Sequence, residues 1–230
     1  MKKFFVKMFF VAFATGLWAQ PSITYNGEFI LSFVQATDAG QKVNSLPRFT
    51  CFFHSGMQTH QDLGKAFGFF SGVNIRNIGF ITVQDSLKLK RRSYSLGIPL
   101  AIKLGNVKKH YYFFGGAEYE MLFHYKEKQF IDGVKRAKQT EWFSDKVNTF
   151  IPSVLGGIQF PTGLQVMVKY YLNDFMNKNY STTIAGVNTY PYRNFNSRIF
   201  YISVCSNIRW PDVQEIKKKA QPVPSETNNI

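Results

Sequence analysis

The sequence has few of the residues that build metal centres and disulfide scaffolds. It contains two cysteines and four histidines in 230 residues, too few for a disulfide framework or a cysteine-rich zinc module. None of the histidines has the spacing of a metal-binding motif; they are His54, His60, His110 and His124. We therefore expect no metal, no cofactor and no catalytic site.

Acidic residues and long apolar runs are also scarce. Asp and Glu number 14 against 28 Lys and Arg, which gives a formal net charge of +14. Charged residues make up only 18% of the chain and aromatic residues 17%, a composition too apolar for a disordered protein. Beyond the N-terminus no apolar run reaches the roughly 18 residues of a membrane-spanning helix. The chain is expected to fold, and without a helical membrane span.

The N-terminal segment has the layout of an export signal. Three lysines come before the apolar run 8–14, and small residues follow it as far as Ala19. This pattern predicts a secretory signal peptide over residues 1–19. The alternative, an uncleaved membrane anchor, is disfavoured because the apolar run is too short to span a bilayer. An exported protein whose basic residues are scattered is not expected to bind nucleic acid.

The rest of the chain repeats a period of two. From Tyr94 to Leu104 every second residue is apolar, which indicates a strand with two different faces. Its eleven residues match the nine to eleven that a tilted strand needs to cross a bilayer, roughly twice an ordinary strand. The same alternation, strong or weak, predicts seven further strands, at 24–35, 48–60, 65–82, 110–126, 147–160, 164–173 and 200–210.

The connections between these segments alternate in length. Short ones at 61–64, 105–109 and 161–163 follow the second, fourth and sixth strands, and longer ones follow the odd-numbered strands. This pattern predicts an all-β fold, an eight-stranded antiparallel up-and-down transmembrane β-barrel over residues 20–210. Residues 211–230 form a polar tail, expected to be disordered or to dock a periplasmic partner. The competing fold is a soluble barrel of lipocalin type, with a polar exterior and an apolar interior.

A family resemblance lies in the middle of the chain. The segment from Tyr94 to Lys103, followed by a short turn and the aromatic segment from Tyr111 to Gly116, resembles the signature strands of small PorT-like outer-membrane barrels of Bacteroidota. The resemblance implies a non-enzymatic barrel in the outer membrane, a structural or accessory component linked to type IX secretion. The alternatives are a narrow channel or small-solute porin and, more distantly, an outward-facing enzyme.

Charged residues on the inward face of the strands are the best candidates for chemistry. Charges removed from water must be paired, because an unpaired buried ion is costly. The parity of the strands therefore predicts an ion-pair network that plugs the lumen, with a substrate or ion pathway as the alternative. The predicted members are Glu28, Arg76, Lys103, Glu118, Glu120, Lys169 and Arg209. By the same parity Cys51 faces outward and Cys205 inward, so no disulfide is expected between them.

A second basic group is expected in an outer loop after the third strand. It consists of Lys88, Lys90, Arg91 and Arg92. Such side chains suit the phosphates of lipopolysaccharide, although an ordinary solvated loop has the same composition. The expected partners are outer-membrane lipid, lipopolysaccharide phosphates and other envelope or secretion-complex proteins.

Overall fold

The computed structural model of the chain describes residues 21–184 and 186–209, and every regular element in these ranges is a β-strand. No helix in these ranges is long and apolar enough to cross a membrane. The predicted signal peptide at 1–19 and the predicted tail at 211–230 lie outside the described residues.

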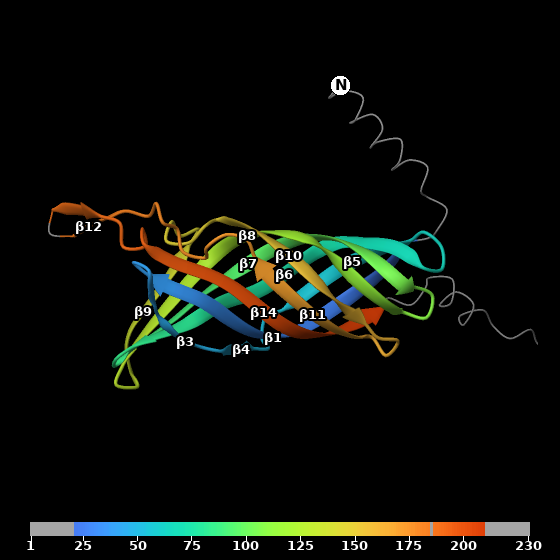
Figure 1. Cartoon of the computed structure of the whole chain (residues 1–230), viewed down its shortest axis with the longest axis horizontal. Coiled ribbons are helices and arrows are strands. Elements are labelled where there is room, and N and C mark those ends of the chain that lie inside the picture. The colour runs from blue at the N-terminus through green and yellow to red at the C-terminus, as the bar shows by residue number, and fades with distance from the viewer. Residues whose placement is uncertain (1–20, 185, 210–230) are drawn as a thin grey trace, which may run out of the picture.

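Eight of the strands form a closed antiparallel ring (Figure 1). Each pairs with the next, and the last pairs with the first. Their order round the ring is β1 (Ser22–Asp38), β5 (Ser55–Asp62), β6 (Phe67–Gln84), β7 (Leu87–Asn106), β8 (Tyr111–Ile131), β10 (Phe150–Gln159), β11 (Leu164–Tyr171) and β14 (Phe195–Arg209). The predicted eight-stranded up-and-down barrel is confirmed.

The three short connections lie together at one end of the barrel (Figure 1). They are the turns at 63–66, 107–110 and 160–163. β1 begins and β14 ends at the same end, which we call the short-turn end. The opposite end carries the larger excursions of the chain, and we call it the long-loop end.

The predicted strand at 48–60 is broken in two. Its second part is β5. Its first part, β4 (Arg48–Thr50), lies with the short strand β3 (Asn44–Leu46) in a segment of residues 43–54 that we call the strap. The short strand β2 (Gln41–Lys42) leads into the strap. β3 pairs with β6 and β4 pairs with β1. The strap thus fills the seam between β1 and β6 near the long-loop end, where the backbone N–H of Asn77 donates to Nδ1 of His54 at 3.3 Å.

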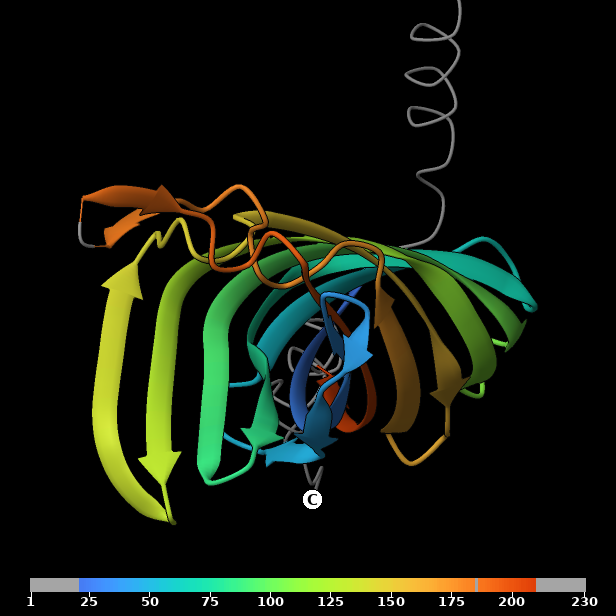
Figure 2. The same ribbon diagram turned by 60° about the vertical axis from the view of Figure 1, so that its left-hand side comes forward.

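The strands near the long-loop end are longer than their hydropathy indicates. β6 and β7 are joined by the two-residue turn Asp85–Ser86, so the expected long loop after the third strand is wrong. The expected loop at 127–146 is wrong as well, because β8 continues and turns into β9 (Val134–Trp142). Asp132 and Gly133, with φ of 50° and 78°, make the two-residue turn that favours such a hairpin. Figure 2 shows β7, β8 and β9 as a curved sheet reaching past the ring.

One further hairpin interrupts the long connection between β11 and β14. Its strands are β12 (Thr182–Ile184) and β13 (Val187–Thr189), which pair only with each other among the described residues. This hairpin lies at the long-loop end, away from the ring (Figures 1 and 2).

The outer surface of the ring is an apolar belt. On β7 the side chains of Ile98, Leu100, Ile102 and Leu104 are between 48% and 63% exposed, while the residues between them are small or point into the barrel. A soluble barrel would bury such residues inside and expose polar ones. An exposed belt of this kind is stable in hydrocarbon, and a closed ring leaves no unpaired strand edge there. The barrel is therefore built to span a membrane.

Candidate functional site

Five charged residues meet in the middle of the lumen. Arg76 lies at the centre of this lumen network: its Nε donates to Glu28 Oε2 at 2.6 Å and its Nη1 to Glu118 Oε1 at 2.5 Å. Lys169 forms ion pairs with Glu118 at 2.8 Å and with Glu120. All five side chains are at most 6% exposed. The structure thus brings together residues from β1, β6, β8 and β11, which are far apart in the sequence.

Neutral side chains add hydrogen bonds to two of the carboxylates in the lumen network. The Tyr171 hydroxyl donates to both carboxylate oxygens of Glu120, at 3.1 and 3.0 Å, and Asn74 Nδ2 donates to Glu118 at 3.2 Å. Buried carboxylates are stable only when they accept several such bonds. These two neutral partners were not predicted, although both lie on the inward face by the same parity.

Aromatic and aliphatic side chains close the lumen above and below the network. Toward the long-loop end Phe80 packs against Phe175 and Phe195, with ring centroids 5.6 and 6.4 Å apart. Toward the short-turn end Phe70 packs against Phe114 at 5.7 Å. A cavity beside the network has a volume of about 10 Å³, which is about the space of one water molecule. The interior is therefore a packed core and not an open pore.

The long-loop end of the lumen holds a separate ion pair. Arg91 Nε donates to Glu127 Oε2 at 2.9 Å, and the hydroxyl of Tyr125 donates to the same oxygen at 2.8 Å. The Arg91 guanidinium also lies 5.6 Å from the centroid of the Phe195 ring. The prediction that placed Arg91 in an outer loop is wrong: it lies on β7, is 9% exposed and faces the lumen.

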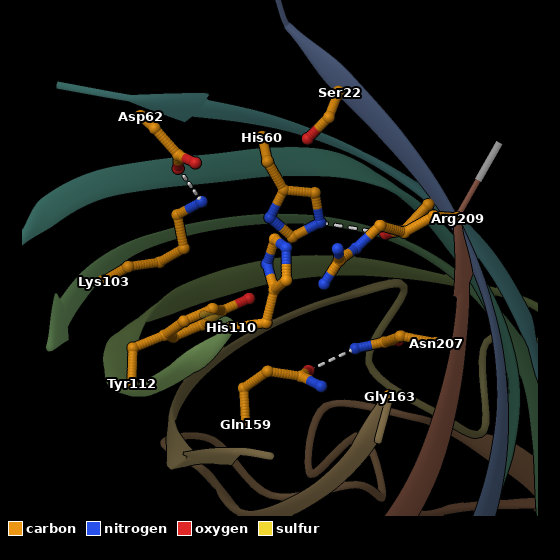
Figure 3. A pocket seen from close by; sticks show the side chains of 11 residues that line it. Ser22, His60, Asp62, Lys103, His110, Tyr112, Gln159, Gly163, Asn207 and Arg209 are labelled. Carbon is orange, nitrogen blue, oxygen red and sulfur yellow. Dashed lines mark hydrogen bonds and ion pairs between the residues drawn. The ribbon is translucent and has the colours of Figure 1, made fainter. Parts of the chain in front are cut away.

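Two predicted members of the lumen network lie elsewhere. Lys103 pairs with Asp62 at the short-turn end, and Arg209 lies at the same mouth. Figure 3 shows their side chains converging with those of His60, His110 and Tyr112 on a small pocket. The expectation of one network of seven residues is therefore corrected to a central group of five and a mouth that contains the other two.

The mouth pocket is small and polar. Its volume is about 20 Å³, enough for about one water molecule. His60 Nε2 lies 2.9 Å from the Thr24 hydroxyl, and Asn207 donates to Gln159 at 2.6 Å. Within the described residues no group of three or more His, Cys, Asp or Glu side chains could hold a metal ion. Cys51 and Cys205 are free thiols.

The other members of the predicted outer-loop cluster also lie on β7. Lys88, Lys90 and Arg92 alternate with inward-facing residues and therefore point away from the lumen. Across the sheet Arg92 is opposite Lys126 of β8, and Lys90 is opposite Lys128, which in turn is opposite Lys138 of β9. We call Lys90, Arg92, Lys126, Lys128 and Lys138 the cationic face. The expectation of a solvated loop is wrong because the strands continue beyond the belt.

The comparisons with known proteins concern the fold alone. No protein-family model matches the sequence, and no curated protein matches it. Ail, the attachment invasion locus protein of Yersinia pestis, solved with the heparin analogue sucrose octasulfate, is 10% identical over 82% of this chain and 97% of its own, with a TM-score of 0.35. Neisserial surface protein A is 11% identical over the same shares, with a TM-score of 0.38. The closed strand ring is what establishes the barrel.

Proposed function

We propose that this protein is a sealed, non-enzymatic β-barrel of the outer membrane of a Gram-negative bacterium. The observation that carries the proposal is the combination of an apolar outer belt with a lumen filled by ion pairs and aromatic rings. The belt fits lipid, and the filled lumen leaves no path for a solute. In the outer membrane the short-turn end faces the periplasm and the long-loop end faces outward.

We further propose that the barrel serves as a structural or accessory component of an envelope complex. The resemblance of the segment from Tyr94 to Gly116 to PorT-like barrels supports a role beside a type IX secretion system. The sheet formed by β7, β8 and β9 supplies a surface outside the membrane on which a partner can dock. One edge of β9 is open to such a partner, since β9 pairs only with β8 among the described strands. The alternative function is a narrow channel, which would require that the lumen conducts.

The test combines fractionation with a gel-shift measurement. Full-length protein is extracted from the outer-membrane fraction in detergent and run on SDS gels with and without boiling. A closed membrane barrel remains folded in SDS until it is heated, so the unboiled band is expected to migrate differently from the boiled one. Protein recovered from the soluble periplasm without a shift would contradict the proposal.

Planar-bilayer recordings then separate a sealed barrel from a channel. Purified protein that shows the gel shift is inserted at single-molecule density and scanned for stepwise currents. A silent bilayer with verified insertion is expected. Reproducible unit steps would show that the lumen conducts and would replace the accessory role with that of a narrow channel.

A further inference from the structure

The like charges on the cationic face repel one another, which destabilises this part of the sheet. In antiparallel strands, directly opposite residues have Cβ atoms about 5 Å apart, and like charges in such positions repel. Here Lys90, Lys128 and Lys138 form one row across three strands, and Arg92 and Lys126 begin the next. None of the five has an ion pair with a described carboxylate. A bound anion would relieve the repulsion within this row.

The electrostatics of the lysines agree with this crowding. Partial burial, followed by the charges of Arg92, Lys138 and Lys128, lowers the pKa of Lys126. Partial burial and the charges of neighbouring cations, Arg92 first among them, lower the pKa of Lys128 in the same way. Both residues lie beyond the apolar belt, in the extension of β8. Each bears its charge at a cost that an anion would offset.

The cationic face lies directly above the membrane boundary. The next row toward the belt consists of Tyr94, His124 and Trp142, whose rings stack with centroids 5.4 Å apart for Tyr94 and His124 and 4.4 Å for His124 and Trp142. Aromatic rows of this kind mark the interface between hydrocarbon and lipid headgroups. The cations therefore stand at the height of the headgroups of the outer leaflet.

A cleft beside this face has a cationic wall and a second wall that combines apolar side chains with one arginine. Its volume is about 430 Å³. Arg92, Lys126 and Lys128 line one side. Phe49, Phe52 and Ile81 line the other, together with Arg48 of the strap. Phe49 and Phe52 belong to the strap and are 65% and 73% exposed. A soluble anion makes no favourable contact with the phenyl rings of Phe49 and Phe52, whereas a lipid with a phosphorylated headgroup can contact both the cations and the rings.

We propose that the cationic face and the adjoining cleft bind the phosphate-bearing headgroup of an outer-leaflet lipid of the lipid A class. The ammonium and guanidinium groups donate charge-assisted hydrogen bonds to the phosphates, and the phenyl rings of the strap contact the first carbons of the acyl chains. This site requires that the barrel is embedded in a membrane, but it does not require that the lumen is sealed.

The experiment measures lipid binding to purified full-length protein in detergent. The probes are diphosphorylated lipid A, the same lipid without phosphates, and inorganic pyrophosphate. Lys90→Gln, Lys128→Gln and Lys138→Gln are combined in one variant. The matched control combines Lys65→Gln, Lys108→Gln and Lys109→Gln, three exposed lysines at the short-turn end. We expect the first variant to bind lipid A at least about tenfold more weakly than wild type, and the control to bind it equally well.

Two further arms separate the sources of the phosphate. Lipid A without phosphates should bind wild-type protein as weakly as intact lipid A binds the triple variant. Phe49→Ser combined with Phe52→Ser should weaken binding of lipid A and leave that of pyrophosphate unchanged. Pyrophosphate that displaces lipid A at equal concentration would overturn the assignment in favour of a simple anion site, and equal lipid A affinity of the two triple variants would overturn it altogether.

The gel shift on boiling serves as the folding control for every variant. Because replacing lysines by glutamine relieves repulsion, the triple variant should unfold no more readily than wild type in lipid-free detergent. If it unfolds more readily, the cations serve the fold and the proposal fails. Should the triple variant not fold, Arg92→Gln with Lys126→Gln carries the same expectation for lipid A.

Discussion

The residue with most influence on the stability of the barrel is Arg76. Its guanidinium contacts three carboxylates in the lumen, those of Glu28, Glu118 and Glu120. With all groups ionised, the lumen network has three negative and two positive charges. Its net charge is therefore already negative, and loss of Arg76 would make it more negative. Removing a partner from a buried ion pair leaves an uncompensated charge, which costs more than the pair itself contributes.

We therefore expect Arg76→Met to lower the free energy of unfolding by about 3–5 kcal/mol. Glu28→Gln is the matched comparison, because it removes one negative charge, keeps an oxygen acceptor for Arg76 and leaves the network neutral; it should cost clearly less. Urea unfolding of both variants in lipid vesicles measures the difference. Equal losses for the two variants would show that the charge balance of the network does not matter.

Glu127 should make stability depend on pH at the long-loop end. Burial alone would raise the pKa of Glu127, but Arg91 and the hydrogen bonds of Gln129 and Tyr125 outweigh it and hold this pKa below its ordinary value near 4.5. A carboxyl with a lowered folded pKa adds stability above its unfolded pKa and loses it as the pH falls through the folded one.

The unfolding free energy of wild type should thus exceed that of Glu127→Gln by about 1.5 kcal/mol at neutral pH, and the gap should close in acid below pH 4.5. Denaturant unfolding of the two proteins between pH 3 and pH 7 measures it. Asp85→Asn, an exposed carboxyl in the β6–β7 turn, should show no such gap. A constant difference between wild type and Glu127→Gln at all pH values would contradict the ion pair.

At the scale of the strands, the sheet of β7, β8 and β9 has a lipid-facing part and a part outside the membrane. Leu100 is 63% exposed within the apolar belt, and Val134 is 54% exposed at the tip of the β8–β9 hairpin. Leu100→Arg should destabilise the barrel in vesicles by about 2–4 kcal/mol, because an arginine near the bilayer midplane is costly. Val134→Arg should have little effect. Unfolding in vesicles of the two variants measures this, and indistinguishable stabilities would place Leu100 in water.

Alternation predicted the eight ring strands because contact with lipid favours apolar residues at the outward positions of the belt. Above the belt the same backbone continues, but several outward residues of β8 and β9 are lysines, among them Lys126, Lys128 and Lys138, and the hydropathy no longer alternates. The strand β9 and the ends of β7 and β8 were therefore assigned to loops. The dipeptide Asp132-Gly133, typical of a two-residue hairpin turn, was the signal in the sequence that could have located them.

The site shows a similar division between what parity predicts and what it cannot. Parity predicted the face for the seven charged residues that were assigned to strands, and Glu118 and Lys169 do meet in the lumen. It predicts no height along the barrel axis, because height depends on strand tilt and register. Lys103 and Arg209 share that face but lie at the short-turn mouth, several residues along the strands from the network. Register had to come from the three-dimensional pairing.

At the scale of the whole molecule, the lumen is filled by three layers of side chains. The lumen network lies between the aromatic layer of Phe80, Phe175 and Phe195 and the layer of Phe70 and Phe114. A change in the network should therefore weaken the barrel without opening it. This is the property that distinguishes a structural plug from the gate of a channel.

We expect Glu118→Gln combined with Glu120→Gln to lower the temperature at which the unboiled band is lost on SDS gels, because Lys169 loses both of its carboxylate partners and Arg76 keeps only Glu28. Its planar-bilayer recordings should stay as silent as those of wild type, since the aromatic layers remain in place. Glu141→Gln, on β9 outside the ring, is the control and should change neither property. Unit currents from the double variant with an unchanged melting temperature would mean that the carboxylates gate a pathway. The interpretation of the lumen network as a structural plug would then be wrong.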